Sequence, residues 1–196
     1  MGSLIFLLNN DATPEPSCLE ALVQAMDAYP EAGSCATRMV LSHQPDTLDS
    51  AGDGFSICGA AFKRGHLEPV EKYEADEWVF GACGGAALYR RQMLEEVGLL
   101  DEEYYLVHED SDLNFRAQMM NYPCRYVSAA VVNHRCNATL SAYSPGYVYF
   151  TQRNVERLFF KTVPAQLIWR MLPRHILYNI LGFLYFLTRG KGLVFI

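Results

Sequence analysis

Leu4-Ile-Phe-Leu-Leu-Asn-Asn-Asp11 is the stretch that decides the fold. Five apolar residues run without a break and give way to three small polar residues, of which the last is a carboxylate. An apolar run of this kind predicts a strand buried on both faces of an α/β sheet. Because ligands bind beyond the carboxyl ends of such strands, Asp11 is a candidate metal or phosphate ligand. Taken alone, it is equally explained as an N-cap or turn residue.

The residues after Asp11 predict a β-α-β unit. Thr13 and Pro14 fit a helix N-cap and a first helical position. Apolar residues then recur at helical spacing, and residues 34–41 predict the next strand. Residues 42–73 are rich in Gly, Asp, Pro and Ser without sustained periodicity, so we expect a long loop where specificity resides. The remaining expected elements are a strand at 78–89, a helix at 90–97 closed by Gly98, a helix at 110–121 and a strand at 125–133.

Composition favours one folded domain, since 51% of the 196 residues are hydrophobic and 19% are charged. The six cysteines form no CxxC pair and follow no secretory signal, which predicts reduced thiols in the cytoplasm rather than disulfides or a zinc site. The acidic body argues against nucleic acid as a partner. No Ser-His-Asp or Cys-His arrangement stands out, and the glycines do not follow Rossmann or P-loop spacing.

The last part of the chain has the opposite charge. Residues 152–196 hold seven Lys and Arg residues against the single acid Glu156, a net charge of +6, so the remainder carries −12 of the total of −6. Basic residues interleaved with aromatic ones fit an anionic membrane surface, where each Lys or Arg contributes about 1 kcal/mol. The uncharged run 176–188 is shorter than the roughly 20 residues that cross a bilayer. We therefore expect a body at 1–151 and a helical tail at 152–196 that lies on the membrane, or alternatively a helix pair docked on the body.

His108-Glu109-Asp110-Ser111-Asp112 is the sharpest chemical signal. Three acids within four residues stabilise a helix N-terminus electrostatically, which is the structural explanation. The functional explanation is that one of them is a general base. A strand that ends in Asn133-His134-Arg135 adds an imidazole.

Together, Asn9-Asn10-Asp11, the Glu109–Asp110 pair and His134 resemble the metal motif, the catalytic-base motif and the late histidine of family 2 glycosyltransferases, most closely the rhamnosyltransferase-like branch. The resemblance extends from the first strand to about Lys161. It implies an α/β fold in which a partial GT-A (Rossmann-like) mixed sheet is flanked by helices and followed by the helical, membrane-associating tail.

The resemblance also implies roles. Asp11 and His134 would bind Mn²⁺ or Mg²⁺ at the two phosphates of a sugar nucleotide. Asp110 would be the catalytic base, and Glu109 would orient acceptor or backbone. The residues assigned to the substrate side are Asn9, Asn10, Gly84, Gly85, Asp112 in a supporting role, Arg153 and Asn154. A strand bend explains the glycine pair equally well, and a basic helix face explains Arg153 and Asn154.

The implied activity is inverting transfer of a sugar, rhamnose by resemblance, from a nucleotide-diphosphate donor to a glycan or polyprenyl-linked acceptor. Its setting would be cell-envelope polysaccharide synthesis at the cytoplasmic face of the plasma membrane. The family's usual first strands, which bind base and ribose, have no counterpart here, so we expect the N-terminal nucleotide-binding part to be missing and the chain to be poorly soluble. The alternatives are a catalytically silent fragment that binds membrane or a partner, and a metal-dependent hydrolase.

Overall fold

The computed structural model describes residues 2–136 and 144–195. These residues form two compact units. The first is made of residues up to Gly54, Phe62–Leu100 and Asp110–Cys136, and the second is made of Phe55–Ala61, Asp101–Glu109 and the described residues from 144 onward. The expected boundary between residues 151 and 152 falls inside a helix of the second unit.

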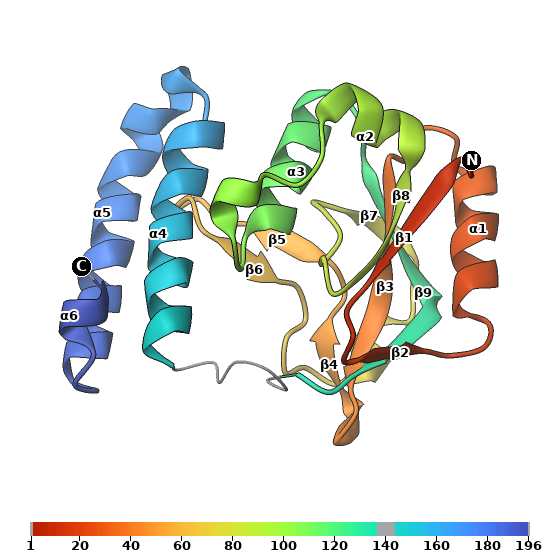
Figure 1. Cartoon of the computed structure of the whole chain (residues 1–196), viewed down its shortest axis with the longest axis horizontal. Helices are drawn as coiled ribbons and strands as arrows, with labels where there is room; N and C mark the ends of the chain where they lie inside the picture. The colour runs from red at the N-terminus through yellow and green to blue at the C-terminus, as the bar shows by residue number, and fades with distance from the viewer. Residues whose placement is uncertain (1, 137–143, 196) are drawn as a thin grey trace. The chain divides into compact units, whose positions relative to one another are not determined.

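A mixed seven-stranded sheet is the centre of the first unit (Figure 1). Its strands lie in the order β1-β8-β3-β9-β2, with β4 paired to β3 and β7 paired to β9. β3 and β9 are parallel and the other pairs are antiparallel. The bounds are β1 Leu4–Leu8, β2 Ala12–Pro14, β3 Ser34–Leu41, β4 Gln44–Ser50, β7 Glu77–Val79, β8 Ala86–Arg90 and β9 Cys124–His134.

Helices cover both faces of this sheet (Figure 1). On β3, Cys35 and Met39 pack into the core beneath α1 (Cys18–Ala28), whereas Ala36 and Val40 face the opposite core. That second core contains residues of α2 (Arg91–Val97) and α3 (Glu109–Met119). Because side chains alternate between two covered faces, seven of the eight residues of β3 are buried. The prediction of a mixed α/β fold is confirmed.

The expected helix start at Thr13 and Pro14 is wrong. These residues form β2 at the edge of the sheet, where Thr13 pairs with Asn133, and α1 begins only after Ser17. Proline cannot donate a backbone N–H, so an edge strand is the place in a sheet that accepts it. This pairing depends on β9, which lies more than a hundred residues further along the chain.

The expected long loop at 42–73 is also largely wrong. It contains β4, β5 (Asp53–Phe55), β6 (Ala61–Lys63) and the 3₁₀ helix Val70–Tyr73, and β5 pairs with β6. Three successive residues of β4, Leu48, Asp49 and Ser50, are fully buried. A strand that buries polar residues on both sides shows neither alternation nor an apolar run, so the sequence carries no periodic signal for it.

The other expected elements are present. Residues 78–89 divide into β7 and β8, and the expected helices correspond to α2 and α3. Gly98 ends α2 with φ of 93°, a value that favours glycine. All six cysteines are free thiols.

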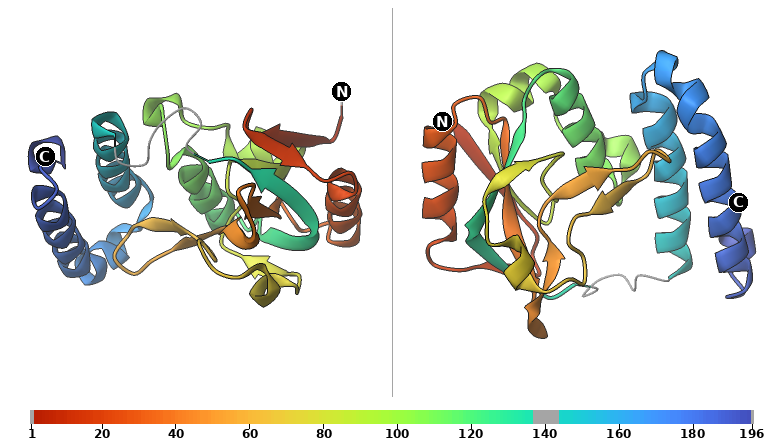
Figure 2. Two further views of the ribbon diagram at one scale, coloured as in Figure 1. Left: turned by 90° about the horizontal axis from the view of Figure 1, so that it is seen from below. Right: turned by 180° about the vertical axis from the view of Figure 1, so that it is seen from behind.

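The second unit is built on a pair of helices, α4 (Pro145–Thr162) and α5 (Ala165–Leu187), followed by the short α6 (Gly192–Phe195). Two residues join α4 to α5, so the helices run antiparallel and side by side (Figures 1 and 2). His175 is 2% exposed and stacks on Phe159 with 3.9 Å between ring centroids. Among the described residues, no helix has the length and apolar character needed to span a membrane.

Candidate functional site

The ends of β1, β2 and β9 bring the two expected metal ligands together in the first unit. Asp11 follows β1 and directly precedes Ala12, which pairs with His134 at the end of β9. The backbone N–H of Arg135 donates to the carbonyl of Asp11 at 3.0 Å. As a result, Nε2 of His134 lies 3.2 Å from Oδ1 of Asp11 although the residues are 123 positions apart.

The other ring nitrogen of His134 contacts Asp49, a residue that sequence analysis missed. Nδ1 of His134 lies 2.8 Å from Oδ2 of Asp49, whose side chain is fully buried. Nζ of Lys63 donates to both Asp49 carboxylate oxygens at 2.8 and 2.9 Å. Nδ1 of His66 lies 2.9 Å from the Asp49 carbonyl oxygen. No sequence signal indicated Asp49, because it lies in the aperiodic region described above.

These contacts shift the protonation equilibria in opposite directions. The hydrogen bond to Asp49, with that to Cys136, raises the pKa of His134 from 6.5 to about 10. Burial alone would raise the pKa of Asp49, but hydrogen bonds from His134 and His66 and the ammonium of Lys63 outweigh it and lower that pKa well below its ordinary value. Without a metal, His134 and Asp49 therefore form an ion pair across neutral pH.

The donor atoms fit a hard divalent cation on the Asp11 side of His134. Two ligands at right angles, each about 2.1 Å from a cation, lie about 3.0 Å apart, close to the separation between Asp11 and His134. Asp49, His134 and Cys136 also bring ligand atoms within 4.8 Å of one another. However, Nδ1 is committed to Asp49, and the ammonium of Lys63 on that carboxylate repels a cation there. A carboxylate behind a ligating histidine is the usual arrangement in metal sites, because it fixes ring orientation and tautomer.

The expected catalytic base is held by the expected glycine. The backbone N–H of Gly84 donates to Oδ2 of Asp110 at 2.8 Å, and that of Ser111 donates to Oδ1 at 2.7 Å. A Cβ atom on Gly84 would lie 3.1 Å from Cβ and 3.2 Å from Oδ2 of Asp110. Glycine at this position therefore permits close approach between the loop before β8 and the start of α3.

The neighbouring glycine connects this loop to β1. The backbone N–H of Asn9 donates to the carbonyl of Gly85 at 2.9 Å, and a Cβ on Gly85 would lie 2.7 Å from Cε of Met39. Both Asn9 and Asn10 are exposed. The structure thus links the strand that ends at the expected metal ligand to the loop that holds the expected base.

Asp110 has two further titratable neighbours, Asp53 and Cys83, with ligand atoms of all three within 4.8 Å of one another. Burial raises the pKa of Cys83 well above its ordinary value, so Cys83 is a neutral thiol at physiological pH. Asn114 donates to Asp53 at 3.3 Å and accepts from the N–H of Ala82 at 3.2 Å. A neutral thiol is a poor metal ligand, and these contacts favour a surrounding shell for the base rather than a second metal centre.

Asp112 lies one turn into α3, and its side chain is fully buried against Arg116, whose Nε donates at 2.8 Å. Arg116 donates in turn to the carbonyls of Val97 and Leu99. These contacts tie α3 to the end of α2, and a supporting role for Asp112 on the substrate side stays a prediction. Glu109 is the first residue of α3 and is half-buried, and its orienting role stays a prediction.

Arg153 and Asn154 anchor a strained segment within the second unit. Nδ2 of Asn154 lies within 2.9 Å of the carbonyls of Tyr104, Leu106 and Val107. Nη2 of Arg153 donates to the carbonyls of Glu103 and Tyr104 at 2.8 Å each. The positive φ angles, 60° at Tyr105, 57° at Val107 and 68° at His108, are costly for side chains with a Cβ. The two residues thus stabilise the segment that leads into Glu109 and Asp110, and their contact with substrate stays a prediction.

Comparison with known proteins gives the family. The model of glycosyl transferase family 2 matches residues 1–98, half of the chain. This protein therefore belongs to glycosyltransferase family 2, as the resemblance predicted.

Two curated relatives share 28% identity over 155 residues, which cover 69% of this chain and 48% of each relative. Both are N-acetylglucosaminyl-diphospho-decaprenol L-rhamnosyltransferases of Mycobacterium tuberculosis, from strains CDC 1551 / Oshkosh and ATCC 25618 / H37Rv. The chain thus spans about half the length of these relatives. Among solved structures, GalNAc-T7 with UDP, GalNAc and Mn²⁺ aligns with a TM-score of 0.56 and 15% identity, covering 80% of this chain and 32% of that one. This likeness supports a GT-A-like fold.

Proposed function

We propose that this chain carries the metal site and the catalytic base of an inverting glycosyltransferase. The reaction would move a sugar from a nucleotide-diphosphate donor to a glycan or polyprenyl-linked acceptor in cell-envelope polysaccharide synthesis. The observation that carries the proposal is the 3.2 Å approach of Nε2 of His134 to Oδ1 of Asp11 at the end of the central sheet. The mycobacterial relatives, whose names specify L-rhamnose and a decaprenyl acceptor, favour rhamnose and a lipid-linked acceptor.

Asp11 and His134 would hold Mg²⁺ or Mn²⁺, which neutralises the negative charge on the departing diphosphate. Asp49 keeps the His134 ring in place through Nδ1, so that Nε2 stays directed at Asp11. Lys63 pairs with the buried carboxylate of Asp49 and helps to balance its charge. The neighbour crystallised with Mn²⁺ and UDP supports this choice of cation.

Asp110 would take the proton of the acceptor hydroxyl as this oxygen attacks the anomeric carbon. Its carboxylate is oriented by the N–H groups of Gly84 and Ser111. A sugar hydroxyl is a weak nucleophile, and a positioned carboxylate contributes about 10²- to 10⁴-fold to such a step. With one base on the acceptor side and the diphosphate leaving from the opposite face, a single displacement inverts the anomeric configuration.

The helical tail would hold the protein at the cytoplasmic face of the plasma membrane. Its large apolar side chains that are at least 42% exposed include Leu167, Trp169, Ile176, Leu177, Ile180, Leu181, Leu184 and Leu187. Arg170, Arg174 and Arg189 are exposed on or next to the same helix. Apolar residues combined with basic ones fit an anionic interface, and no helix in the described part of the tail combines the length and apolar character of a membrane span.

The test is a transfer assay with dTDP-L-rhamnose and N-acetylglucosaminyl-diphospho-polyprenol, with Mn²⁺ or with EDTA. We expect metal-dependent product whose anomeric configuration, measured by NMR, is opposite to that of the donor. Asp110→Asn should lower the rate of product formation about 10²- to 10⁴-fold, whereas the control Glu95→Gln, an exposed acid on α2, should leave it unchanged. Retention of configuration or unaltered activity in EDTA would contradict the proposal. Free rhamnose without acceptor dependence would indicate the hydrolase, and lipid binding without any turnover would indicate a silent fragment.

A further inference from the structure

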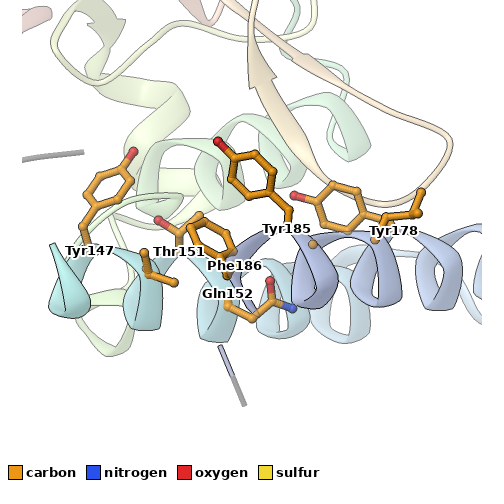
Figure 3. Close-up of a pocket in the computed structure, with 9 residues that line it drawn as sticks. Tyr147, Thr151, Gln152, Tyr178, Tyr185 and Phe186 are labelled. Carbon is orange, nitrogen blue, oxygen red and sulfur yellow. The ribbon is translucent and has the colours of Figure 1, made fainter. Parts of the chain in front are cut away.

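A pocket of about 390 Å³ lies between α4 and α5 and has no part in the chemistry proposed above (Figure 3). The side chains that define it are Tyr147, Thr151 and Gln152 of α4 and Tyr178, Tyr185 and Phe186 of α5. Its volume is in the range of small-molecule sites. The pocket is formed entirely by the second unit.

The walls of the pocket are mainly aromatic and apolar. The rings of Tyr147, Tyr178 and Tyr185 project to the same side of the helix pair (Figure 3). Tyr185 and Phe186 pack edge to face with 5.2 Å between ring centroids. Aromatic rings of this kind bury large apolar areas while keeping a polar edge, as at sites that receive lipids.

A polar network beside the pocket fixes the spacing of the two helices. Nε2 of Gln152 donates to Oδ1 of Asn179, and Nδ2 of Asn179 donates to Oε1 of Glu156 at 2.7 Å. Nε2 of His175 lies 3.0 Å from the same Glu156 oxygen, and its Nδ1 lies 2.8 Å from the carbonyl of Cys58. Since these groups cross-link α4 and α5, the pocket is preformed and need not be opened by a ligand.

The pocket also contains one polar group that the protein leaves unsatisfied. Oγ1 of Thr151 is buried and has no hydrogen-bond partner within the described part of the chain. Helical threonines commonly donate to the carbonyl four residues earlier, so an unpartnered hydroxyl here is unusual. A ligand that is apolar along most of its length and polar at one end would satisfy both the aromatic walls and this hydroxyl.

We propose that this pocket receives the first isoprene units of the polyprenyl-linked acceptor, next to the diphosphate. The inference rests on the proposed function, because that function supplies a lipid-linked acceptor. A basic group lies next to the pocket, since the guanidinium of Arg189 is 4.4 Å from the ring centroid of the lining residue Tyr185, and the single acid of the tail, Glu156, is engaged in the network. The pocket is too small for a long polyprenyl chain, so the remaining units would extend into the membrane.

The test uses geranylgeranyl diphosphate as the probe and isothermal titration as the measurement. Gly182→Leu fills the pocket and Tyr178→Ala removes one of its walls. Ile180→Ala is the matched control, since Ile180 belongs to the same helix, is 50% exposed and does not line the pocket. We expect binding to weaken at least tenfold in both pocket variants and to change less than twofold in the control. Thermal unfolding of each variant shows whether it is folded.

Two further arms separate the possible outcomes. Inorganic diphosphate should bind at least tenfold more weakly than the probe, and equal binding would show that only the anion is recognised, which overturns the proposal. Unchanged probe binding in both pocket variants would overturn it as well, as would equal weakening in the control. Nucleotide binding, measured as the thermal shift that dTDP causes, should be the same in all variants. If wild type shows no thermal shift with dTDP but still binds the probe in a way that the pocket variants weaken, the proposed transfer activity fails and the lipid pocket stands.

Discussion

Nδ1 of His134 lies 2.8 Å from Oδ2 of Asp49, a carboxylate with a fully buried side chain. The contact joins the end of β9 to the interior of β4, across 85 positions of sequence. It leaves Nε2 directed at Asp11, at 3.2 Å. The geometry of the expected metal site therefore depends on a residue that would not itself touch the metal.

Asp49→Asn should weaken Mn²⁺ binding about 10- to 100-fold, because the amide no longer holds His134 through a charged hydrogen bond. The same substitution leaves Lys63 without its carboxylate partner, so the free energy of unfolding should fall as well. Isothermal titration gives the affinity, and denaturant unfolding shows whether the variant is folded at the temperature used. Asp46→Asn, an exposed position on the same strand, is the matched control. Equal Mn²⁺ affinity in wild type and Asp49→Asn would contradict the positioning role.

The pKa of His134 predicts a pH dependence of stability in the absence of metal. A pKa raised from 6.5 to about 10 means that the imidazolium stabilises the fold fully below pH 6.5 and that this contribution is lost as pH rises toward 10. The difference in unfolding free energy between wild type and His134→Gln should therefore shrink between pH 6.5 and 10. Denaturant titrations in EDTA at several pH values measure it. A difference that stays constant over this window would count against the ion pair.

Because the pKa of Asp49 is lowered, its contribution to stability should be lost at acid pH. The carboxylate contributes stability above its ordinary pKa of 3.8, and the contribution is lost as pH falls below that value. The stability difference between wild type and Asp49→Asn should therefore decrease on acidification below about pH 4. Denaturant unfolding between pH 3 and 7 follows this difference, with Asp46→Asn again as the control. An unchanged difference at the acid end would refute the assignment of an ionised Asp49.

Gly84→Ala should reduce transfer without much loss of stability. The new Cβ atom would lie 3.1 Å from Cβ of Asp110, so the base must move by a few tenths of an ångström. Displacement of a catalytic group by up to 1 Å lowers rates by as much as about 10²-fold, and we expect a reduction of roughly tenfold in kcat. Gly146→Ala is the control, since a Cβ there meets no atom within 4 Å. Unaltered kcat in Gly84→Ala would show that Asp110 tolerates displacement or is not the base.

Asn154→Ala should destabilise the segment before the base. It removes the amide that contacts three carbonyls between Tyr104 and Val107, where two residues have positive φ angles. Buried carbonyls left without a donor cost about 1–3 kcal/mol, which is the expected loss in unfolding free energy. Limited proteolysis should then cut residues 103–108 faster than in wild type. Gln166→Ala, exposed on α5, should show neither effect. Equal cleavage in wild type and Asn154→Ala would exclude the anchoring role.

Local sequence patterns were sufficient to predict several of the strands and helices. The apolar run of β1 and the helical spacing that continues through α1 predicted those elements, residues 34–41 were correctly expected as the strand β3, and Gly98 marked the end of α2. Three short polar segments supplied the candidate site, namely residues 9–11, 108–112 and 133–135. The fold places Asp11 beside His134 and Gly84 beside Asp110, although each pair is separated by at least 26 positions.

The buried position of Asp49 and the strand β2 were not predicted, because both depend on partners that are distant in sequence. Asp49 is a polar residue buried in a strand without alternation, and its carboxylate contacts His134, Lys63 and His66 there. Thr13 and Pro14 carry the signature of a helix start, yet pairing of Ala12–Pro14 with the end of β9 overrides that preference. In both cases the deciding contact is made by β9, the strand of this sheet that comes last in the sequence.

The central claim, that Asp11 and His134 hold a divalent cation for a nucleotide diphosphate, is tested most directly by thermal unfolding of the purified chain with Mn²⁺ plus dTDP or UDP. We predict that Mn²⁺ and nucleotide together raise the midpoint of wild type, and that Asp11→Ala and His134→Ala, each folded in the absence of ligand, lose this shift. The control Asp46→Asn should keep the wild-type shift. A shift of equal size in wild type and in both site variants would contradict the claim, because the cation would then bind elsewhere.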